Sequence, residues 1–587
     1  MLKILKHFKK KEWAIVCLSV LFIVAQVWLD LKMPGYMYKI TMLVQAKDSK
    51  ISEIWVEGGY MLLCAVGSLI SAVVVGFFAS RVAATLSMRL RALVFTKTLS
   101  FSMEEINGFS TASLITRSTN DITQVQMIIA MGLQIIIKAP ILAVWAIIKI
   151  SGKSWQWSVM TGIAVLILLT MLSIIIIFAL PKYKIIQGLT DNLNRVTREN
   201  LTGLRVVRAY NAEKYQEHKF QEANIKLTDT NLFTNRIMAI MMPSMVLIMS
   251  GLSLAIYWIG AHLINSADMM TKFTLFSDMV VFSAYAMQVI MAFMMMTMIF
   301  IMLPRAAVSA KRINEVLDTQ SKILDGTISS DSNVKKGEIE FRNVSFKYPD
   351  SSEYVLENIN FSANRGETVA FIGSTGSGKS TLINLIPRFY DATEGEVFID
   401  GINVKDFTQE ALHNKLGYVP QKAVIFSGTV KSNVVYGNNK EDNTVEDTVS
   451  KAIEIAQATE FVENMNDQYE GAIAQGGNNI SGGQKQRLSI ARAIYRKPEI
   501  YIFDDSFSAL DYKTDRVLRS ALKKETNHTT SLIVAQRIGT IKDADKIIVL
   551  DEGKIIGIGK HKELLESCDV YKQIALSQLS KEELDNE

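Results

Sequence analysis

The sequence has few cysteines and few charged residues for its length. Its 587 residues include only three cysteines, Cys17, Cys64 and Cys568, and these stand far apart. Such spacing excludes a disulfide framework and lacks the pattern of metal ligands, so the soluble part of the chain is expected to face the cytosol. Charged residues make up 21% of the chain and hydrophobic residues 49%, which is an apolar balance for a soluble protein.

The chain also has little net charge and no repetitive sequence. The formal net charge is only +5, too small to indicate a nucleic-acid partner. No internal repeat or low-complexity segment is present. A chain of this length exceeds one ordinary core, so we expect at least two domains.

The hydrophobic excess lies almost entirely before about Pro304. A basic N-terminus is followed by an apolar run that is too long for a signal peptide and lacks a small-residue cleavage site. Five more windows are long enough for the ~20 helical residues that cross a hydrocarbon core. Residues 1–320 are therefore predicted to form a helical membrane domain with six spans, Trp13–Leu29, Tyr60–Ala79, Met127–Ile150, Val159–Leu180, Ile237–Ile264 and Phe273–Leu303.

Basic residues in the connecting segments predict the orientation of these spans. The N-terminus and the long segments Arg81–Gln126 and Pro181–Arg236 are rich in lysine and arginine, whereas the shorter connections are less basic. The positive-inside rule then places both termini in the cytosol. The apolar residues of both long segments have helical spacing, which indicates cytosolic extensions of the helices. The chain is thus expected to be a multi-pass protein of the cell membrane, in contact with lipid.

Some side chains in the apolar windows suggest a function beyond spanning. Asp30, Lys138 and Asp278 are charged, and charges at membrane depth mark functional sites by default. Asp30 and Asp278 also fit the outer interface, while Lys138 lies mid-window and is the better cavity candidate. The last window is rich in methionine, which suits surfaces that re-pack around varied apolar ligands, although packing filler is an equal alternative: Met287, Met291, Met294, Met295, Met296, Met298 and Met302.

The second half of the chain has a different composition. The polar stretch 321–337 is predicted to be a linker. From Glu338 onward strand-like and helix-like segments alternate, which predicts an α/β domain over residues 338–577, followed by a polar tail at 578–587.

A phosphate-binding loop of the form G-x-x-x-x-G-K-S opens near the start of this α/β domain. A β-like run, Thr368–Ile372, precedes the loop, and a helix-compatible run follows it. The glycines let backbone N–H groups point at phosphate oxygens. Lys379 can reach the β- and γ-phosphates, and Ser380 can hold Mg²⁺. The predicted nucleotide-binding residues here are Gly373, Ser374, Thr375, Gly376, Ser377, Gly378, Lys379, Ser380 and Thr381.

Other segments complete a nucleotide site. The apolar run Ile500–Phe503 ends in Asp504, which would hold Mg²⁺ at the end of a buried parallel strand. Gln421 is suited to sense the ion or the attacking water, and Tyr348 can stack on a purine. A second phosphate-binding helix start suggests a contact made across a dimer; its residues are Ser481, Gly482, Gly483 and Gln484.

The order of these motifs resembles the ATP-binding-cassette ATPase domain, and six preceding spans resemble the type IV ABC exporters. The matching residues are Tyr348, Gly373–Thr381, Gln421, Ile480–Gln484, Asp504 and Ser508–Asp511, and Glu199–Glu213 resembles that family's second cytosolic loop. The resemblance implies ATP and Mg²⁺ as cofactors. It also implies a dimer that holds two ATP molecules, each between the phosphate loop of one chain and the signature of the other.

Two positions depart from the family pattern. Where the family has a glutamate after the Mg²⁺ aspartate, this chain has Asp505, whose carboxylate reaches about 1.5 Å less far. Where the family has a histidine, this chain has Gln536, which hydrogen-bonds but carries no charge. A third, less decisive change is Gln475, which stands before the signature where the family often has a glutamate. The residues at the catalytic positions are thus Asp505, Gln536 and Gln421, and the two changes at Asp505 and Gln536 predict a site that binds ATP and hydrolyses it weakly.

This combination resembles the degenerate half of heterodimeric bacterial multidrug exporters. We therefore expect a half-transporter that pairs with a homologous but non-identical subunit and exports amphipathic or apolar small molecules. Two alternatives stay open: a homodimeric lipid or peptide exporter with slow hydrolysis, and a membrane-bound ATP sensor or regulatory subunit with no transport path.

Overall fold

The computed structural model describes residues 2–46, 49–329, 336–349, 351–437, 445–526 and 528–578. The chain divides into two compact units. The membrane unit comprises Met1–Leu99 and Thr111–Thr319, and the nucleotide unit comprises Ser100–Ser110 and Gln320–Glu587. Residues 330–335 of the predicted linker and 579–587 of the predicted tail lie outside the described residues.

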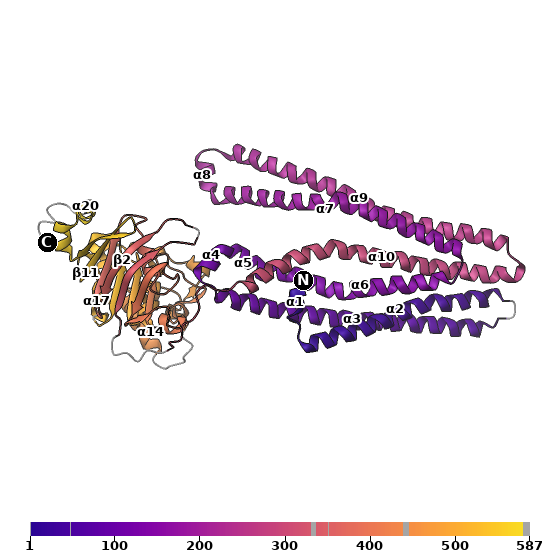
Figure 1. Ribbon diagram of the computed structural model, residues 1–587, viewed down its shortest axis with the longest axis horizontal. Helices are drawn as coiled ribbons and strands as arrows, with labels where there is room; N and C mark the ends of the chain where they lie inside the picture. The colour runs from indigo at the N-terminus through magenta and orange to yellow at the C-terminus, as the bar shows by residue number, and fades with distance from the viewer. Residues whose placement is uncertain are drawn as a thin grey trace. The chain divides into compact units, whose positions relative to one another are not determined.

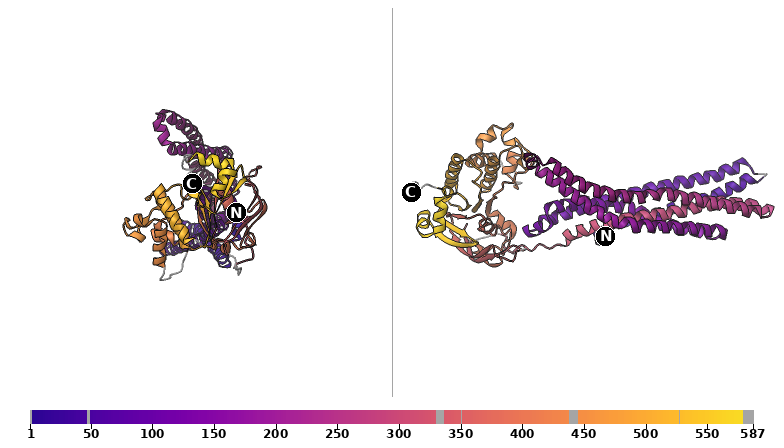
Figure 2. Two further views of the ribbon diagram at one scale, coloured as in Figure 1. Left: turned by 90° about the vertical axis from the view of Figure 1, so that its left-hand side faces the viewer. Right: turned by 90° about the horizontal axis from the view of Figure 1, so that it is seen from above.

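Long helices dominate the membrane unit and run side by side (Figure 1 and Figure 2). Within the residues that the structure describes, six helical segments are long and apolar enough to cross a membrane, which confirms the predicted number of spans. The helices extend well beyond the apolar windows because the basic segments are helical too. The long helices are α2 (Lys10–Gln45), α3 (Ile51–Leu99), α6 (Asn120–Ser151), α7 (Trp155–Thr202), α9 (Glu213–Asn265) and α10 (Met269–Asp318). The short α1 (Leu2–Leu5) precedes α2, α5 (Thr111–Ser118) precedes α6, and α8 (Leu204–Ala209) connects α7 to α9.

A shared apolar core holds these helices together. It includes Val27 of α2, Val75 of α3, Ala146 of α6 and Phe282 of α10. Trp157 at the start of α7 is fully buried and its ring lies 5.4 Å from that of Phe282. Helices α7 and α9 lie against each other, and their far ends, joined by α8, stand apart from the other helices of the unit (Figure 1).

The charged residues singled out in the apolar windows, Asp30, Lys138 and Asp278, each form an ion pair. Lys138 Nζ of α6 lies 3.2 Å from Asp30 Oδ2 of α2, and Ser68 of α3 donates a hydrogen bond to the other oxygen of Asp30. Lys153 forms an ion pair with Asp278 of α10. Pairing offsets much of the cost of a charge in an apolar surrounding, so Lys138 neutralises an acid on a neighbouring helix.

Two main sheets form the nucleotide unit. The smaller one is antiparallel with the order β2-β1-β4-β5, and the larger one has the order β12-β11-β3-β10-β9-β6, in which only β12 is antiparallel to its neighbour. The bounds are β1 (Ile339–Phe346), β2 (Leu356–Ala363), β3 (Thr368–Gly373), β4 (Glu394–Ile399), β5 (Ile402–Asn403), β6 (Leu416–Val419), β9 (Ile500–Asp504), β10 (Thr530–Val534), β11 (Lys546–Asp551) and β12 (Lys554–Gly559). A further pair joins β7 (Gly428–Thr429) to β8 (Ala472–Ile473).

Helices cover the larger sheet and divide the interior into separate clusters. One cluster lies between the two sheets and includes Phe371 of β3 and Leu382 of α11 (Lys379–Asn384). A second surrounds α14 (Val445–Ile455) and α16 (Gly482–Tyr495) and includes Leu488. The remaining helices are α12 (Gln409–Asn414), α13 (Val430–Val434), α15 (Thr459–Glu463), α17 (Tyr512–Glu525), α18 (Ile538–Ile541), α19 (His561–Ser567) and α20 (Asp569–Leu576), and the 3-10 turns are Gln468–Glu470 and Gln475–Gly477. The two motifs predicted to bind phosphate thus stand on helices of different clusters.

A short helix from the first half of the sequence belongs to the nucleotide unit. This helix, α4 (Met103–Phe109), carries Asn107, which donates a hydrogen bond to the hydroxyl of Tyr390 over 3.2 Å. The buried carboxylate of Glu105 accepts a bond from the backbone N–H of Lys322 over 3.1 Å. Burial alone would raise the pKa of Glu105, but hydrogen bonds from Ser102 and Lys322 hold the pKa below its usual value. The segment Ser100–Ser110, which the sequence analysis assigned to the membrane domain, therefore belongs to the nucleotide unit.

Candidate functional site

Three neighbouring strands of the larger sheet end at the same edge. In the parallel register Val534 of β10 is aligned with Phe371 of β3 on one side and with Asp504 of β9 on the other. The segments that follow these strands are the phosphate loop, Asp505 and Gln536. The carboxyl edge of a parallel sheet is where ligands bind in α/β proteins, so the register itself assembles the predicted site.

The phosphate loop is shaped by glycines for two distinct reasons. Gly373 packs so closely on β11 that a Cβ atom there would lie 2.0 Å from the backbone oxygen of Leu550. Gly378 has φ +93°, in the left-handed region, and a Cβ atom would lie 2.7 Å from the Leu356 side chain. Only glycine meets both constraints without strain. The chain then turns directly into α11 at Lys379.

The Lys379 ammonium is anchored by the loop itself. Its Nζ atom donates to the backbone oxygens of Gly373 and Ser374 at 3.0 and 2.7 Å and to Ser377 Oγ at 3.1 Å. Burial lowers the pKa of Lys379, while the nearby charges of Asp505 and Asp504 oppose that shift. A cation held among loop atoms in this way is positioned for the phosphates of a nucleotide.

Ser380 and Asp504 face each other across the site. Ser380 Oγ donates to Asp504 Oδ1 over 2.9 Å, and Asp504 is almost fully buried. Burial raises the pKa of Asp504, while the bond from Ser380 lowers it. A hydroxyl and a carboxylate are hard oxygen ligands of the kind that Mg²⁺ prefers in sites shared with nucleotide phosphates. The donor set therefore fits the Mg²⁺ that the sequence analysis predicts.

Two glutamines converge on the carboxylate of Asp505. Gln536 Nε2 lies 2.9 Å and Gln421 Nε2 lies 3.4 Å from the same oxygen, Oδ2. The backbone of Asp505 has φ +45°, and its N–H donates to the oxygen of Val534 over 3.0 Å. Burial raises the pKa of Asp505, although bonds from Gln421 and Ser508 counteract the rise. The structure thus joins all three residues predicted at the catalytic positions.

Tyr348 lies beside the start of α11. Its hydroxyl is hydrogen-bonded to Thr381 Oγ1 over 3.0 Å. Its ring meets those of Phe346 and Tyr390 edge-on, with centroids 5.0 and 5.4 Å apart. The structure therefore fixes the tyrosine next to the phosphate loop, and its stacking on a purine stays a prediction.

The signature residues lie at an exposed helix start. Ser481 caps α16 and forms a reciprocal pair with Gln484, in which Ser481 Oγ accepts from Gln484 N at 3.3 Å and Gln484 Oε1 accepts from Ser481 N at 2.8 Å. Ser481 and Gly482 are exposed. Gly483 packs near the backbone oxygen of Ala509, which links the signature to the Ser508–Asp511 segment. The helix start thus presents its free N–H groups outward.

The structure adds a residue that sequence reasoning missed. Gln578, just after α20, donates from Nε2 to the backbone oxygen of Gln536 over 2.7 Å. Its Oε1 atom accepts from the N–H of Ile538 over 2.9 Å. No motif surrounds Gln578, and its contact partner lies 42 positions earlier, so only the fold reveals it.

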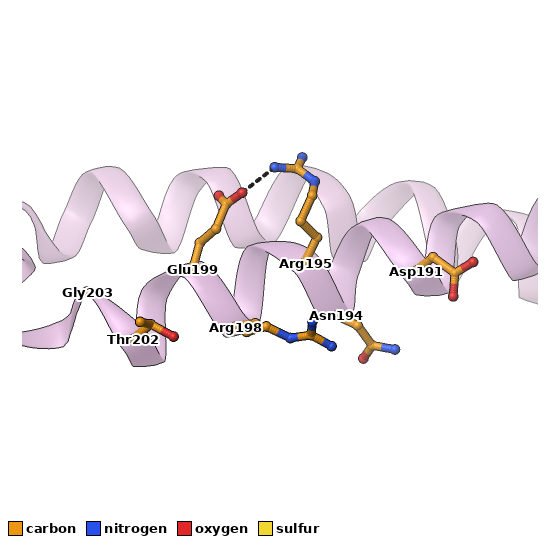
Figure 3. Close-up of a pocket in the computed structure, with 7 residues that line it drawn as sticks. All are labelled: Asp191, Asn194, Arg195, Arg198, Glu199, Thr202 and Gly203. Atoms are coloured by element: carbon orange, nitrogen blue, oxygen red, sulfur yellow. Dashed lines mark hydrogen bonds and ion pairs between the residues drawn. The ribbon is translucent and has the colours of Figure 1, made fainter. Parts of the chain in front are cut away.

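A separate pocket of about 650 Å³ lies on the polar end of α7 (Figure 3). Glu199 there pairs with Arg195 at 2.6 Å and with Lys219 of α9 at 3.0 Å. These ion pairs hold α7 against α9 close to α8. Its lining residues are Asp191, Asn194, Arg195, Arg198, Glu199, Thr202 and Gly203.

Comparison with known proteins identifies the family. Residues 356–508 match the ABC transporter family, and residues 16–293 match the ABC transporter transmembrane region. An uncharacterised ABC transporter ATP-binding protein of Mycobacterium tuberculosis is 38% identical over 526 residues, which cover 89% of this chain and 87% of that protein. A multidrug resistance ABC transporter ATP-binding and permease protein of Lactococcus lactis is 32% identical over 517 residues, covering 87% and 85%.

A solved structure shows the same fold. The structure of a bacterial Atm1-family ABC exporter with ATP bound has a TM-score of 0.81 at 22% identity and covers 97% of this chain and 100% of that one. Members of the family bind ATP, couple its hydrolysis to transport and work as dimers. The chain therefore belongs to the ABC transporter family, with one transmembrane region followed by one ATP-binding region, as in a half-transporter.

Proposed function

We propose that this chain is one half of a heterodimeric exporter that moves amphipathic or apolar compounds out of the cell. In this proposal its own phosphate loop builds an ATP site of weak hydrolysis, and its signature completes the catalytic site of a non-identical partner. The observation that carries the proposal is the bonding of Asp505, whose shorter carboxylate accepts hydrogen bonds from Gln536 and Gln421 at one oxygen.

This bonding disfavours Asp505 as a general base. A base must direct a free lone pair at the attacking water, within hydrogen-bond reach. Two amide donors compete for the Oδ2 atom of Asp505, and the side chain is about 1.5 Å shorter than a glutamate. A misplacement of about 1 Å can lower a rate by about 10²-fold. Gln536 carries no charge with which to offset this loss.

Unlike hydrolysis, ATP binding would not be impaired at this site, because the chain has every residue type that the family uses to bind the nucleotide. The loop amides and Lys379 would hold the phosphates, Ser380 and Asp504 would hold Mg²⁺, and Tyr348 would support the purine. When bound, Mg²⁺ would neutralise phosphate charge. Ser481 and Gly482 would donate to the ATP held by the partner's phosphate loop, with the helix start of α16 adding its partial positive charge.

ATP binding alone can then drive the conformational switch. A ligand shifts an equilibrium by as much as it favours one state over the other, so tight binding with slow hydrolysis suffices at one of two sites. Helix α4 is held to the nucleotide unit by Asn107 and Glu105. We infer that movement of the nucleotide unit reaches the spans through the chain on either side of α4.

The proposed substrate class rests on the membrane unit and on a relative. The Lactococcus lactis protein, 32% identical, is named a multidrug resistance transporter. In α10, Met294 and Met296 pack against the bundle core, whereas Met291 is exposed. Flexible thioethers of this kind adapt to varied apolar ligands.

Co-purification tests the proposal most simply. A tagged copy of this chain, isolated from its native membrane, is expected to co-purify with an equimolar amount of a second half-transporter. That partner is expected to have a glutamate after its own Mg²⁺ aspartate. The reconstituted pair is expected to transport a fluorescent amphiphile with ATP. A homodimer that transports without a second subunit would instead support the homodimeric exporter with slow hydrolysis, and ATP turnover without transport of any amphiphile would support the sensor.

The proposed orientation has a direct test. Both termini and Ser110 are assigned to the cytosol, and Ser49 to the outside, from the charges of the connecting segments. In intact cells of a variant whose own cysteines are replaced, Ser49→Cys is expected to react with an impermeant thiol reagent and Ser110→Cys is not. Labelling of Ser110→Cys alone would reverse the orientation.

A further inference from the structure

A second cavity of the nucleotide unit lies behind Gln536. It measures about 900 Å³ and is bounded by α17 on one side and by α18 and Gln578 on the other. Its floor is apolar and includes Phe503, Phe507 and Ile533. We call it the rear cavity. A space of this size accommodates a peptide segment or a small molecule.

Positive charge surrounds the rear cavity. Its basic lining residues are Arg516, Arg519, Lys523, Arg537 and Lys542, and Asp543 is the one acidic side chain among the described lining residues. Arg519 is already paired with Asp515 at 3.0 Å, whereas Arg516 and Lys523 are exposed at the rim. A cavity lined by one sign of charge attracts the opposite sign. The lining therefore favours an acidic occupant with some apolar surface.

The walls of the rear cavity are hydrogen-bonded to the segment Gln536–Ile538, called here the switch region, which lies beside Asp505 in the candidate site. Gln578 holds the backbone of Gln536 and Ile538, and Gln536 in turn donates to Asp505. Arg519 of α17 reaches the backbone oxygen of Thr540 in α18 over 3.4 Å. Anything that fills the cavity and draws its basic walls together would therefore restrain Gln536.

The sequence supplies a matching acidic segment directly after the wall. Residues 579–587, which lie outside the described residues, read Leu-Ser-Lys-Glu-Glu-Leu-Asp-Asn-Glu, with four acidic residues against one lysine. Leu579 and Leu584 offer apolar side chains for the floor. Nine residues span up to about 30 Å when extended. Because the segment is attached at Gln578, its effective concentration at the cavity would reach about the millimolar range.

We propose that the acidic segment Leu579–Glu587 binds the rear cavity and restrains Gln536 against Asp505. Gln536 must leave Asp505 to contact a nucleotide phosphate, so a bound segment weakens ATP binding at this site. Its release strengthens ATP binding, which raises turnover when ATP is below saturation. This regulation concerns the switch region of any dimer that the chain forms, and it does not depend on whether the partner is identical or on which compound is transported.

Charge reversal in the membrane-reconstituted transporter, complete with its partner subunit, tests the proposal. Changing Glu582, Glu583 and Asp585 together to lysine is expected to raise ATP turnover, at ATP well below saturation, about threefold, which equals about 0.7 kcal/mol. The neutral set Glu582→Gln, Glu583→Gln and Asp585→Asn is expected to raise turnover less. The reversal Arg516→Glu with Lys523→Glu is expected to match the lysine set.

Two comparisons separate binding from a general charge effect. Lys524 follows Lys523 on α17 but does not line the cavity, so Lys524→Glu is expected to leave turnover unchanged. Combining both reversals is expected to restore at least half of the restraint, because the two charges are exchanged. Unchanged turnover in the segment variants, an equal rise with Lys524→Glu, or no restoration in the combined variant would each overturn the proposal. A rise only in the cavity variants would assign the cavity to a different anion and would also overturn it.

Discussion

Ser481→Arg is expected to lower ATP turnover of the purified transporter by about 10²–10³-fold, the usual cost of losing one preorganised donor at a developing charge. Ser481 caps α16 and exposes its hydroxyl at the helix start. An arginine there removes the cap and places a long side chain where the phosphate of the partner's ATP would lie. Because the site is exposed, the substitution costs the fold only about 1 kcal/mol.

Steady-state phosphate release at saturating ATP measures this effect. Ser481→Thr is the matched control, since threonine keeps a capping hydroxyl for Gln484, and it is expected to retain most of the turnover. If Ser481→Arg retained more than about a tenth of the turnover, the predicted loss of a donor would be wrong.

Gly373→Ala is expected to abolish nucleotide binding at this chain's own phosphate loop. The new Cβ atom would lie 2.0 Å from the backbone oxygen of Leu550, which faces Gly373 across the β3–β11 register. No side-chain rotation relieves a clash with a backbone atom in a paired strand. Overpacking of this kind costs about 1–3 kcal/mol, so the melting temperature of the nucleotide unit should fall by several degrees.

Binding of a fluorescent ATP analogue and thermal unfolding both test this expectation. Gly539→Ala is the control, because a Cβ atom there meets nothing within 4 Å. The control is expected to bind nucleotide normally. Normal nucleotide binding by Gly373→Ala would show that β11 yields at Leu550 and would contradict the steric argument.

The membrane spans and the phosphate loop could be predicted from the sequence, because each depends on residues that are close together in the chain. Six apolar windows became six long helices because a span needs only length and hydrophobicity. The phosphate loop was predicted between Thr368–Ile372 and a helix, and the structure places it between β3 and α11. Its glycines are required by φ angles and close contacts that the motif already implies.

Contacts between distant segments lay beyond sequence reasoning. Asp30 and Lys138 were singled out separately, and their ion pair depends on how α2 packs against α6. The hydrogen bonds of Gln578 to Gln536 and of Asn107 to Tyr390 join segments that no motif relates. Such contacts follow from tertiary packing and leave no periodic signal in the chain.

The candidate site falls between these cases. Asp505 and Gln536 were predicted as individual positions from the resemblance to the ATP-binding-cassette ATPases, and Gln421 as a polar group suited to sense Mg²⁺ or the attacking water. Their convergence on one carboxylate oxygen follows from the parallel register of β10, β9 and β6. Sequence reasoning did not predict this register, which brings Gln536 and Gln421 within hydrogen-bond reach of Asp505 and so bears on whether Asp505 can act as a base.

Steady-state phosphate release by the Asp505→Ala transporter tests the central claim most directly. Asp505 is expected to contribute little as a base, because its carboxylate is short and engaged by Gln536 and Gln421. The account therefore predicts that Asp505→Ala keeps most of the turnover of the unaltered transporter, measured at saturating ATP beside Ser481→Arg. An Asp505→Ala transporter as inactive as Ser481→Arg would contradict the account and make this site catalytic.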